Sequence, residues 1–100
     1  MSQTLESIKN LLRDHSDALS QFKVAKLYIF GSFAKGYASE KSDIDILVEF
    51  LPDAKIGFFE FLNLQYALED ILKRKVDLVS KDGIHPALKN QILDEAVDVA

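Results

Sequence analysis

The segment from Asp43 to Phe50 limits the fold of this chain more than any other, because its side chains alternate between two characters. Successive side chains of a strand point to opposite faces, so an alternation of period two is typical of a strand with one buried face. One face consists of Ile44, Ile46, Val48 and Phe50, and the other of Asp43, Asp45, Leu47 and Glu49. The segment therefore predicts a strand that packs on a core and carries acids on its second face.

Helical and strand-forming segments flank this strand on both sides. Apolar spacing predicts an amphipathic helix over about 4–22 with a break near His15–Ser16, and a long helix over 57–73. Two short β-prone runs predict a buried strand over 26–30, which ends at Gly31, and a third strand over 75–79. Pro86 suits the first turn of a last helix that reaches about Val97.

The order of these elements is helix, strand, strand, helix, strand, helix. It predicts an α+β fold (an α/β sandwich) in which a small mixed sheet of about three strands packs against helices. A helix separates the second and third strands, so we expect at least one crossover connection. The length of 100 residues leaves room for one domain, over residues 1–100.

The bulk composition excludes several classes of protein. A net charge of −4 argues against electrostatic capture of nucleic acid. The chain has no cysteine, which excludes disulfides, thiolate zinc sites and cysteine nucleophiles. No apolar run approaches the roughly 20 residues that span a bilayer, and the first residues lack the features of a signal peptide. We therefore expect a cytoplasmic protein that contacts no membrane.

Asp43 and Asp45 stand two apart on the predicted strand, so their carboxylates project from one face. Magnesium prefers oxygen ligands and is typically bound by one or two carboxylates together with water and phosphate oxygens. Asp77 lies inside an apolar strand, where an unpaired charge is expensive and needs a reason. If that strand lies beside the second one, Asp77 becomes a third acid of the same site.

Gly31 and Ser32 follow the first predicted strand directly. Glycine lets the backbone approach a phosphate closely, and a serine that opens a short helix offers a hydroxyl and free amides to an anion. Lys35 and Lys41 can add positive charge to the same place, although both also fit solvated loop lysines. A phosphate cradle beside an acidic metal site predicts binding of a nucleoside triphosphate with magnesium.

The spacing of these motifs resembles a known family. Gly31-Ser32, ten intervening residues and Asp43-Ile44-Asp45 resemble the signature of the DNA polymerase β–like nucleotidyltransferase superfamily. The fuller segments 30–36, 42–45 and 76–79 resemble its small MNT group, whose members are commonly antitoxins of all-helical HEPN-domain toxins. The resemblance covers most of the chain, from the first strand to the last helix.

The resemblance implies a role for each motif residue. Gly31 and Ser32 would hold the triphosphate, with Lys35 and Lys41 as further nucleotide-binding residues. Asp43, Asp45 and Asp77 would be the catalytic and magnesium-binding acids, with Asp77 also a candidate base. The implied activity is transfer of AMP from ATP to a hydroxyl of a partner protein, a HEPN toxin encoded nearby, in a hetero-oligomer.

Two alternatives stay open at this point. The chain could be a non-catalytic antitoxin that neutralises its toxin by binding, or a nucleotidyltransferase that modifies a small molecule such as an aminoglycoside. The aromatic run Phe58, Phe59 and Phe61 bears on the partner, because steps of 100° spread these side chains around a helix. Some apolar surface is therefore expected to remain for a second protein.

Overall fold

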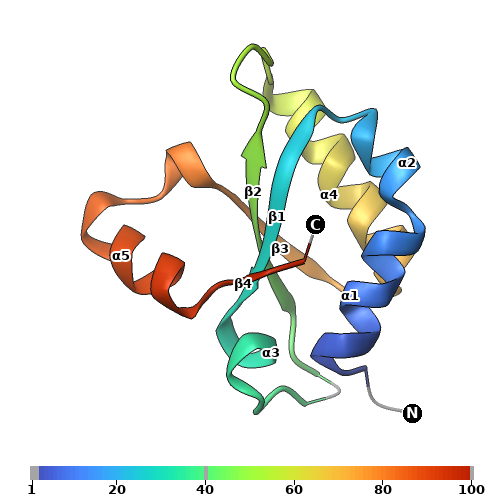
Figure 1. The fold of residues 1–100 in the computed structure, drawn as a ribbon, viewed down its shortest axis with the longest axis vertical. Helices are drawn as coiled ribbons and strands as arrows, with labels where there is room; N and C mark the ends of the chain where they lie inside the picture. The colour runs from blue at the N-terminus through green and yellow to red at the C-terminus, as the bar shows by residue number, and fades with distance from the viewer. Residues whose placement is uncertain (1–2, 40, 100) are drawn as a thin grey trace.

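A computed structural model describes residues 3–39 and 41–99 (Figure 1). The elements in chain order are α1 (Leu5–Asp14), α2 (Ser16–Ser20), β1 (Val24–Phe30), α3 (Gly31–Lys35), β2 (Ile44–Phe50), α4 (Phe58–Leu72), β3 (Val76–Ser80), a 3-10 turn (Lys81–Gly83), α5 (Pro86–Glu95) and β4 (Val97–Asp98). The predicted break in the first helix is confirmed at His15, which separates α1 from α2.

The sheet is mixed and has the strand order β3-β2-β1-β4. β1 pairs antiparallel with β2 and β4, and β2 pairs parallel with β3, so α4 forms the predicted crossover. The α+β fold is confirmed, but the prediction of about three strands was one too few. The last helix ends at Glu95 instead of Val97, because Val97 and Asp98 pair with Ile29 and Tyr28 of β1.

Helices α1 and α4 cover one face of the sheet (Figure 1). The leucines that α4 turns inward recur every four residues, which places them on one side of the helix. The fully buried members of the core are Ile8, Leu12, Leu27, Ile29, Ile44, Ile46, Leu47, Val48, Leu64, Leu68 and Leu72. Among the described residues no helix combines the length and the apolar character needed to cross a membrane.

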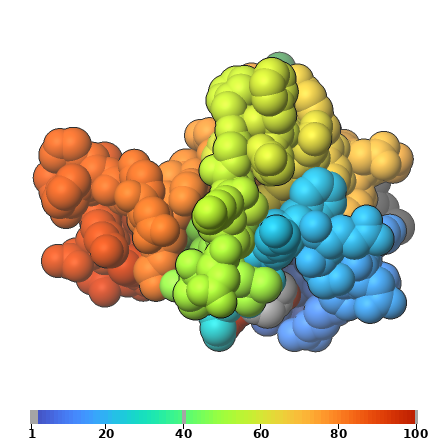
Figure 2. Space-filling model, turned by 90° about the horizontal axis from the view of Figure 1, so that it is seen from above, coloured from blue at the N-terminus to red at the C-terminus, as the bar shows by residue number. Residues whose placement is uncertain are grey.

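Helix α5 lies on the other side of the sheet from α1 and α4 (Figure 1). It begins at Pro86, is capped by the His85 ring, which accepts the Ala87 N–H at 3.1 Å, and has no buried residue. Seen from above, the segment that contains it forms a lobe beside the rest of the molecule (Figure 2). The second face of the sheet is therefore covered far less than the first.

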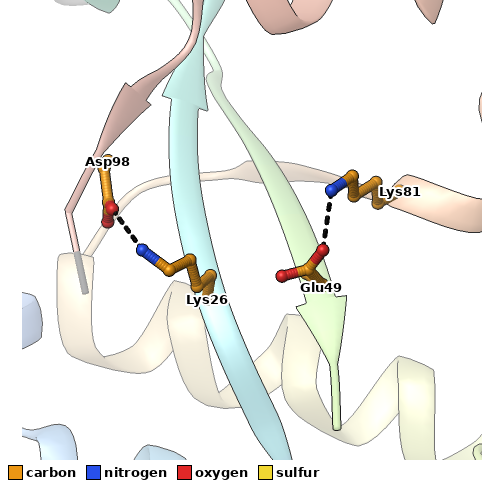
Figure 3. A network of polar contacts seen from close by, with 4 residues as sticks. All are labelled: Lys26, Glu49, Lys81 and Asp98. Atoms are coloured by element: carbon orange, nitrogen blue, oxygen red, sulfur yellow. Dashed lines mark hydrogen bonds and ion pairs between the residues drawn. The ribbon is translucent and has the colours of Figure 1, made fainter. Parts of the chain in front are cut away.

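Two ion pairs lie on this second face (Figure 3). The Lys26 ammonium is 2.8 Å from the Asp98 carboxylate, which links β1 to β4. The Lys81 ammonium is 2.7 Å from the Glu49 carboxylate, which links the segment after β3 to β2. At this end of the face, acids and bases neutralise one another.

Candidate active site

The pairing of β2 with β3 brings two of the predicted acids together. Asp45 and Asp77 are Cα partners in the parallel register, so their side chains leave the sheet on the same face. β2 begins at Ile44, so Asp43 stands one residue before it and is exposed. The sequence predicted that Asp77 would join the other acids if the third strand lay beside the second, and β3 does lie beside β2. Asp77 is itself exposed, so its charge needs no buried partner.

Asp45 lies at the centre of this acidic group. It is half-buried, and burial raises the pKa of its carboxyl above the ordinary value. The negative charges of Asp77 and then Asp43 raise the pKa of Asp45 further. Both other acids are therefore near enough to interact with Asp45, and a cation at this place would relieve the repulsion.

The acids on the second face differ in how they are neutralised. Glu49, which the sequence placed on the same face as Asp45, forms the ion pair with Lys81. Within residues 3–39 and 41–99, the side chains of Asp43, Asp45 and Asp77 form no ion pair and accept no hydrogen bond. Among the described residues, the acids of this face that lack a counter-charge therefore lie at the end where the three aspartates stand.

Gly31 and Ser32 stand at the same end of the sheet. Phe30, the last residue of β1, pairs with Asp45, and Gly31 begins α3 immediately afterwards. Gly31 has φ of +70°, and a Cβ built there would clash with the Asp45 carboxylate, whose Cγ would be 3.0 Å away. Glycine is required at this position both by the backbone conformation and by the close approach of the acid. No side chain caps the start of α3.

The two predicted lysines do not reach this group in the structure. The Lys35 ammonium is 2.9 Å from Glu95 Oε1, an ion pair that ties α3 to the end of α5. The hydrogen bond to Glu95 raises the pKa of Lys35. Lys41 is exposed, and its backbone N–H donates to Ser39 Oγ at 3.3 Å. Glu95 was missed as a partner because 60 positions along the chain separate it from Lys35.

Two polar side chains of α4 that sequence reasoning passed over hold β3 in place. Glu69 accepts the Val76 N–H at 3.0 Å, and the Gln65 amide donates to the Val76 carbonyl at 3.2 Å. Both backbone groups of the residue before Asp77 are thereby fixed. The signal in the sequence was their position next to Leu64 and Leu68 in the predicted helix, because a polar residue close to the core needs a partner.

The oxygen donors of the site fit the ion that the motif implies. No group of three or more His, Asp or Glu side chains in the described part of the chain is arranged to hold a metal by itself. Magnesium does not require such a cage, because it keeps water ligands and takes phosphate oxygens from its nucleotide. Asp43 and Asp45 are oxygen donors without a counter-ion, and they fit that mode of binding.

Comparison with known proteins agrees with this geometry. The profile of the family described as nucleotidyltransferase domain matches residues 12–99, which include every residue of the candidate site. A Methanocaldococcus jannaschii protein named "Putative protein adenylyltransferase MJ1379" is 43% identical over 99 residues, covering 97% of this chain and 99% of that protein.

Two solved structures share the fold. One, titled "Structure of putative minimal nucleotidyltransferase", superposes with a TM-score of 0.79 at 33% identity and covers 95% of each chain. Another, of a toxin–antitoxin with AMP-PNP, gives a TM-score of 0.68 at 28% identity over 93% of this chain and 69% of that chain. The chain belongs to the nucleotidyltransferase family and is an enzyme of its minimal type.

Proposed function

We propose that this nucleotidyltransferase transfers AMP from magnesium-bound ATP to a hydroxyl group of a partner protein, and that the partner is a HEPN-domain toxin. The observation that carries the proposal is the uncompensated charge of Asp43, Asp45 and Asp77 on a face where Glu49 and Asp98 are paired. Three like charges that the backbone holds close together destabilise the fold unless a ligand of opposite charge offsets their repulsion.

The strand order supports separate roles for the groups on the two sides of Asp45. β2 lies between β1 and β3, so Gly31–Ser32 flanks Asp45 on one side and Asp77 on the other. Gly31 and Ser32 would hold the triphosphate, and Asp43 and Asp45 the magnesium ion. Bound magnesium neutralises triphosphate charge and lowers the pKa of the attacking hydroxyl. Asp77 would face the acceptor from the opposite side to the triphosphate.

The reaction then runs as a single displacement. The acceptor oxygen forms a bond to the α-phosphorus, and the bond from that phosphorus to the oxygen bridging the β-phosphate breaks. Pyrophosphate leaves with the electron pair of the broken bond, and the proton of the acceptor hydroxyl passes to Asp77. The main contributions of this chain are position and charge, as in other phosphoryl-type transfers.

A protein acceptor is supported by the surface as well as by the relatives. Phe58 and Phe59 at the start of α4 are 72% and 75% exposed, and their rings meet edge to face at 5.8 Å between centroids. Phe58 also lines a hollow of about 450 Å³, together with Leu51 and Ile56. Exposed aromatic surface of this kind marks a site for a second protein. One matching structure is titled as a toxin–antitoxin, and one relative is named as a protein adenylyltransferase.

The same apolar surface favours a second candidate function, in which the chain neutralises its toxin by binding alone. Masking needs Phe58 and Phe59 but does not need the three aspartates. The two functions therefore differ in their response to loss of an acid.

The test is to co-incubate the protein with its HEPN partner, ATP and magnesium, and to measure the intact mass of the partner. Transfer predicts a gain of one or more adenylyl groups, with no gain when Asp43→Asn replaces the wild type. Glu49→Gln serves as the matched control, because it removes an acid from the same face outside the site. Neutralisation without a mass change, equal in Asp43→Asn, would establish masking instead.

A further inference from the structure

Arg74 lies in the turn between α4 and β3, and its guanidinium contacts segments that are distant in the sequence. Its Nη1 donates to the carbonyl oxygens of Ser39 and Ser42, each at 2.9 Å. Its Nε donates to Gln3 Oε1 at 2.8 Å, and the Gln3 amide in turn donates to the Leu72 carbonyl at 2.6 Å. The side chain is half-buried, and its contacts with Ser42 and Gln3 are partly shielded from water.

The guanidinium also stacks on an aromatic ring. The Cζ atom of Arg74 is 5.1 Å from the centroid of the Phe33 ring, within the range of a cation–π contact. Phe33 is buried and follows Gly31 and Ser32 in α3. The position of α3, and with it that of the Gly-Ser pair, is therefore coupled to Arg74.

These contacts converge on the segments that carry the site. Ser42 is the residue before Asp43, Phe33 is the residue after Ser32, and Arg74 itself stands three residues before Asp77. We infer that Arg74 is a positioning residue, which fixes Asp43 relative to the nucleotide-binding turn without touching the substrate. The inference rests on the proposed function, because it assigns Arg74 a role in that same site.

Arginine is suited to this task in a way that lysine is not. Its planar fork presents five N–H donors in fixed directions and can stack on a ring while it donates in its own plane. A lysine ammonium keeps the charge but is a compact group on a flexible stem. It cannot bridge Ser39 and Ser42, reach Gln3 and stack on Phe33 at the same time. Arg74→Lys therefore removes the geometry and retains the charge.

The chain offers a matched control, because its second arginine, Arg13, is exposed at the end of α1. Wild type, Arg74→Lys and Arg13→Lys are compared under conditions in which all three are fully folded. Three quantities are measured: the kcat and KM of adenylyl transfer, the magnesium concentration for half-maximal rate, and the amide exchange of Ser42 by NMR without nucleotide.

We expect Arg74→Lys to lower kcat by roughly 10- to 100-fold, since small misplacements of catalytic groups have effects of this size. The half-maximal magnesium concentration should rise, the Ser42 amide, which donates to the Ser39 carbonyl, should exchange faster, and KM for ATP should change little. Arg13→Lys should match wild type in all three.

If Arg74→Lys had the same kcat and the same magnesium dependence as wild type, the inference would be overturned, even if the variant were less stable. A wild-type protein that fails to transfer AMP or to bind nucleotide with magnesium would instead overturn the proposed function. The exchange measurement separates the two cases, because it reports whether Arg74 fixes Ser42, the residue before Asp43, when no nucleotide is present.

Discussion

Asp45 and Asp77 are paired in register across two parallel strands, so the backbone holds both side chains on the same face of the sheet. Asp77 and Asp43 both raise the pKa of Asp45, and burial raises it more than either. The repulsion is thus a property of the backbone arrangement. Protonation, substitution or a bound cation can relieve it.

The first prediction is that Asp45→Asn stabilises the protein at neutral pH in the absence of metal. The folded pKa of Asp45 lies above the ordinary 3.8, so folding binds protons, and the stability contribution of Asp45 falls as pH rises from 3.8 through the raised value. Asp45→Asn has no carboxyl group to ionise at this position, so its stability does not fall with pH for this reason. Urea unfolding at several pH values should show its advantage at pH 7 and none near pH 3. A wild type that is the more stable at pH 7 would contradict the account.

The second prediction compares two glycines that both have positive φ. Gly31→Ala and Gly36→Ala should each lower the free energy of unfolding by about 1–2 kcal/mol, because a residue with a Cβ is disfavoured by that amount in the left-handed conformation. Only the Cβ at Gly31 meets the Asp45 carboxylate, whereas nothing lies within 4 Å of one at Gly36. Transfer should be lost in Gly31→Ala and kept in Gly36→Ala. Equal activity in the two variants would show that the contact with Asp45 has no catalytic importance.

The third prediction concerns the proton acceptor. Asp77→Asn should lower kcat by about 10²–10⁴-fold, the typical range for loss of a general base, with little change in nucleotide affinity. Glu49→Gln removes a carboxylate from the same face of the sheet and should leave kcat near the wild-type value. If Asp77→Asn retained normal turnover, Asp77 would be a structural acid.

The fourth prediction separates a structural from a phosphate-binding role of Lys35. Lys35→Met and Glu95→Gln both break the ion pair between α3 and α5, and because that pair is exposed to solvent, each substitution should lower the stability of the protein only slightly. If Lys35 binds the triphosphate, Lys35→Met weakens ATP binding, whereas Glu95→Gln frees the ammonium and preserves it. Equal affinity in the two variants would leave Lys35 with the structural role alone.

Local sequence pattern predicted most of the fold. The alternation over 43–50 and the apolar spacing of the helices are local properties, so the strands and helices appear close to where the pattern places them. β4 was missed because two residues, Val97 and Asp98, carry no alternation that could be recognised. They form a strand only because β1 offers an unpaired edge.

The site was predictable where it depends on motifs and not where it depends on distant contacts. Gly31, Ser32, Asp43 and Asp45 lie in one short stretch, and the register of β3 then places Asp77 beside Asp45. The contacts of Lys35 with Glu95 and of Arg74 with Ser39 and Ser42 join segments more than 30 residues apart. No periodicity encodes such contacts, so only the structure reveals them.

The most direct test of the account is calorimetric binding of the α,β-methylene analogue of ATP, which cannot release pyrophosphate. The titration is run with magnesium and with EDTA, on wild type, Asp43→Asn and Glu49→Gln. The account predicts binding to wild type and Glu49→Gln with magnesium, and affinity lower by about tenfold or more, equivalent to 1.4 kcal/mol, in EDTA or in Asp43→Asn. Binding that is equally tight in EDTA, or unchanged in Asp43→Asn, would contradict the assignment of a magnesium–nucleotide site to these acids.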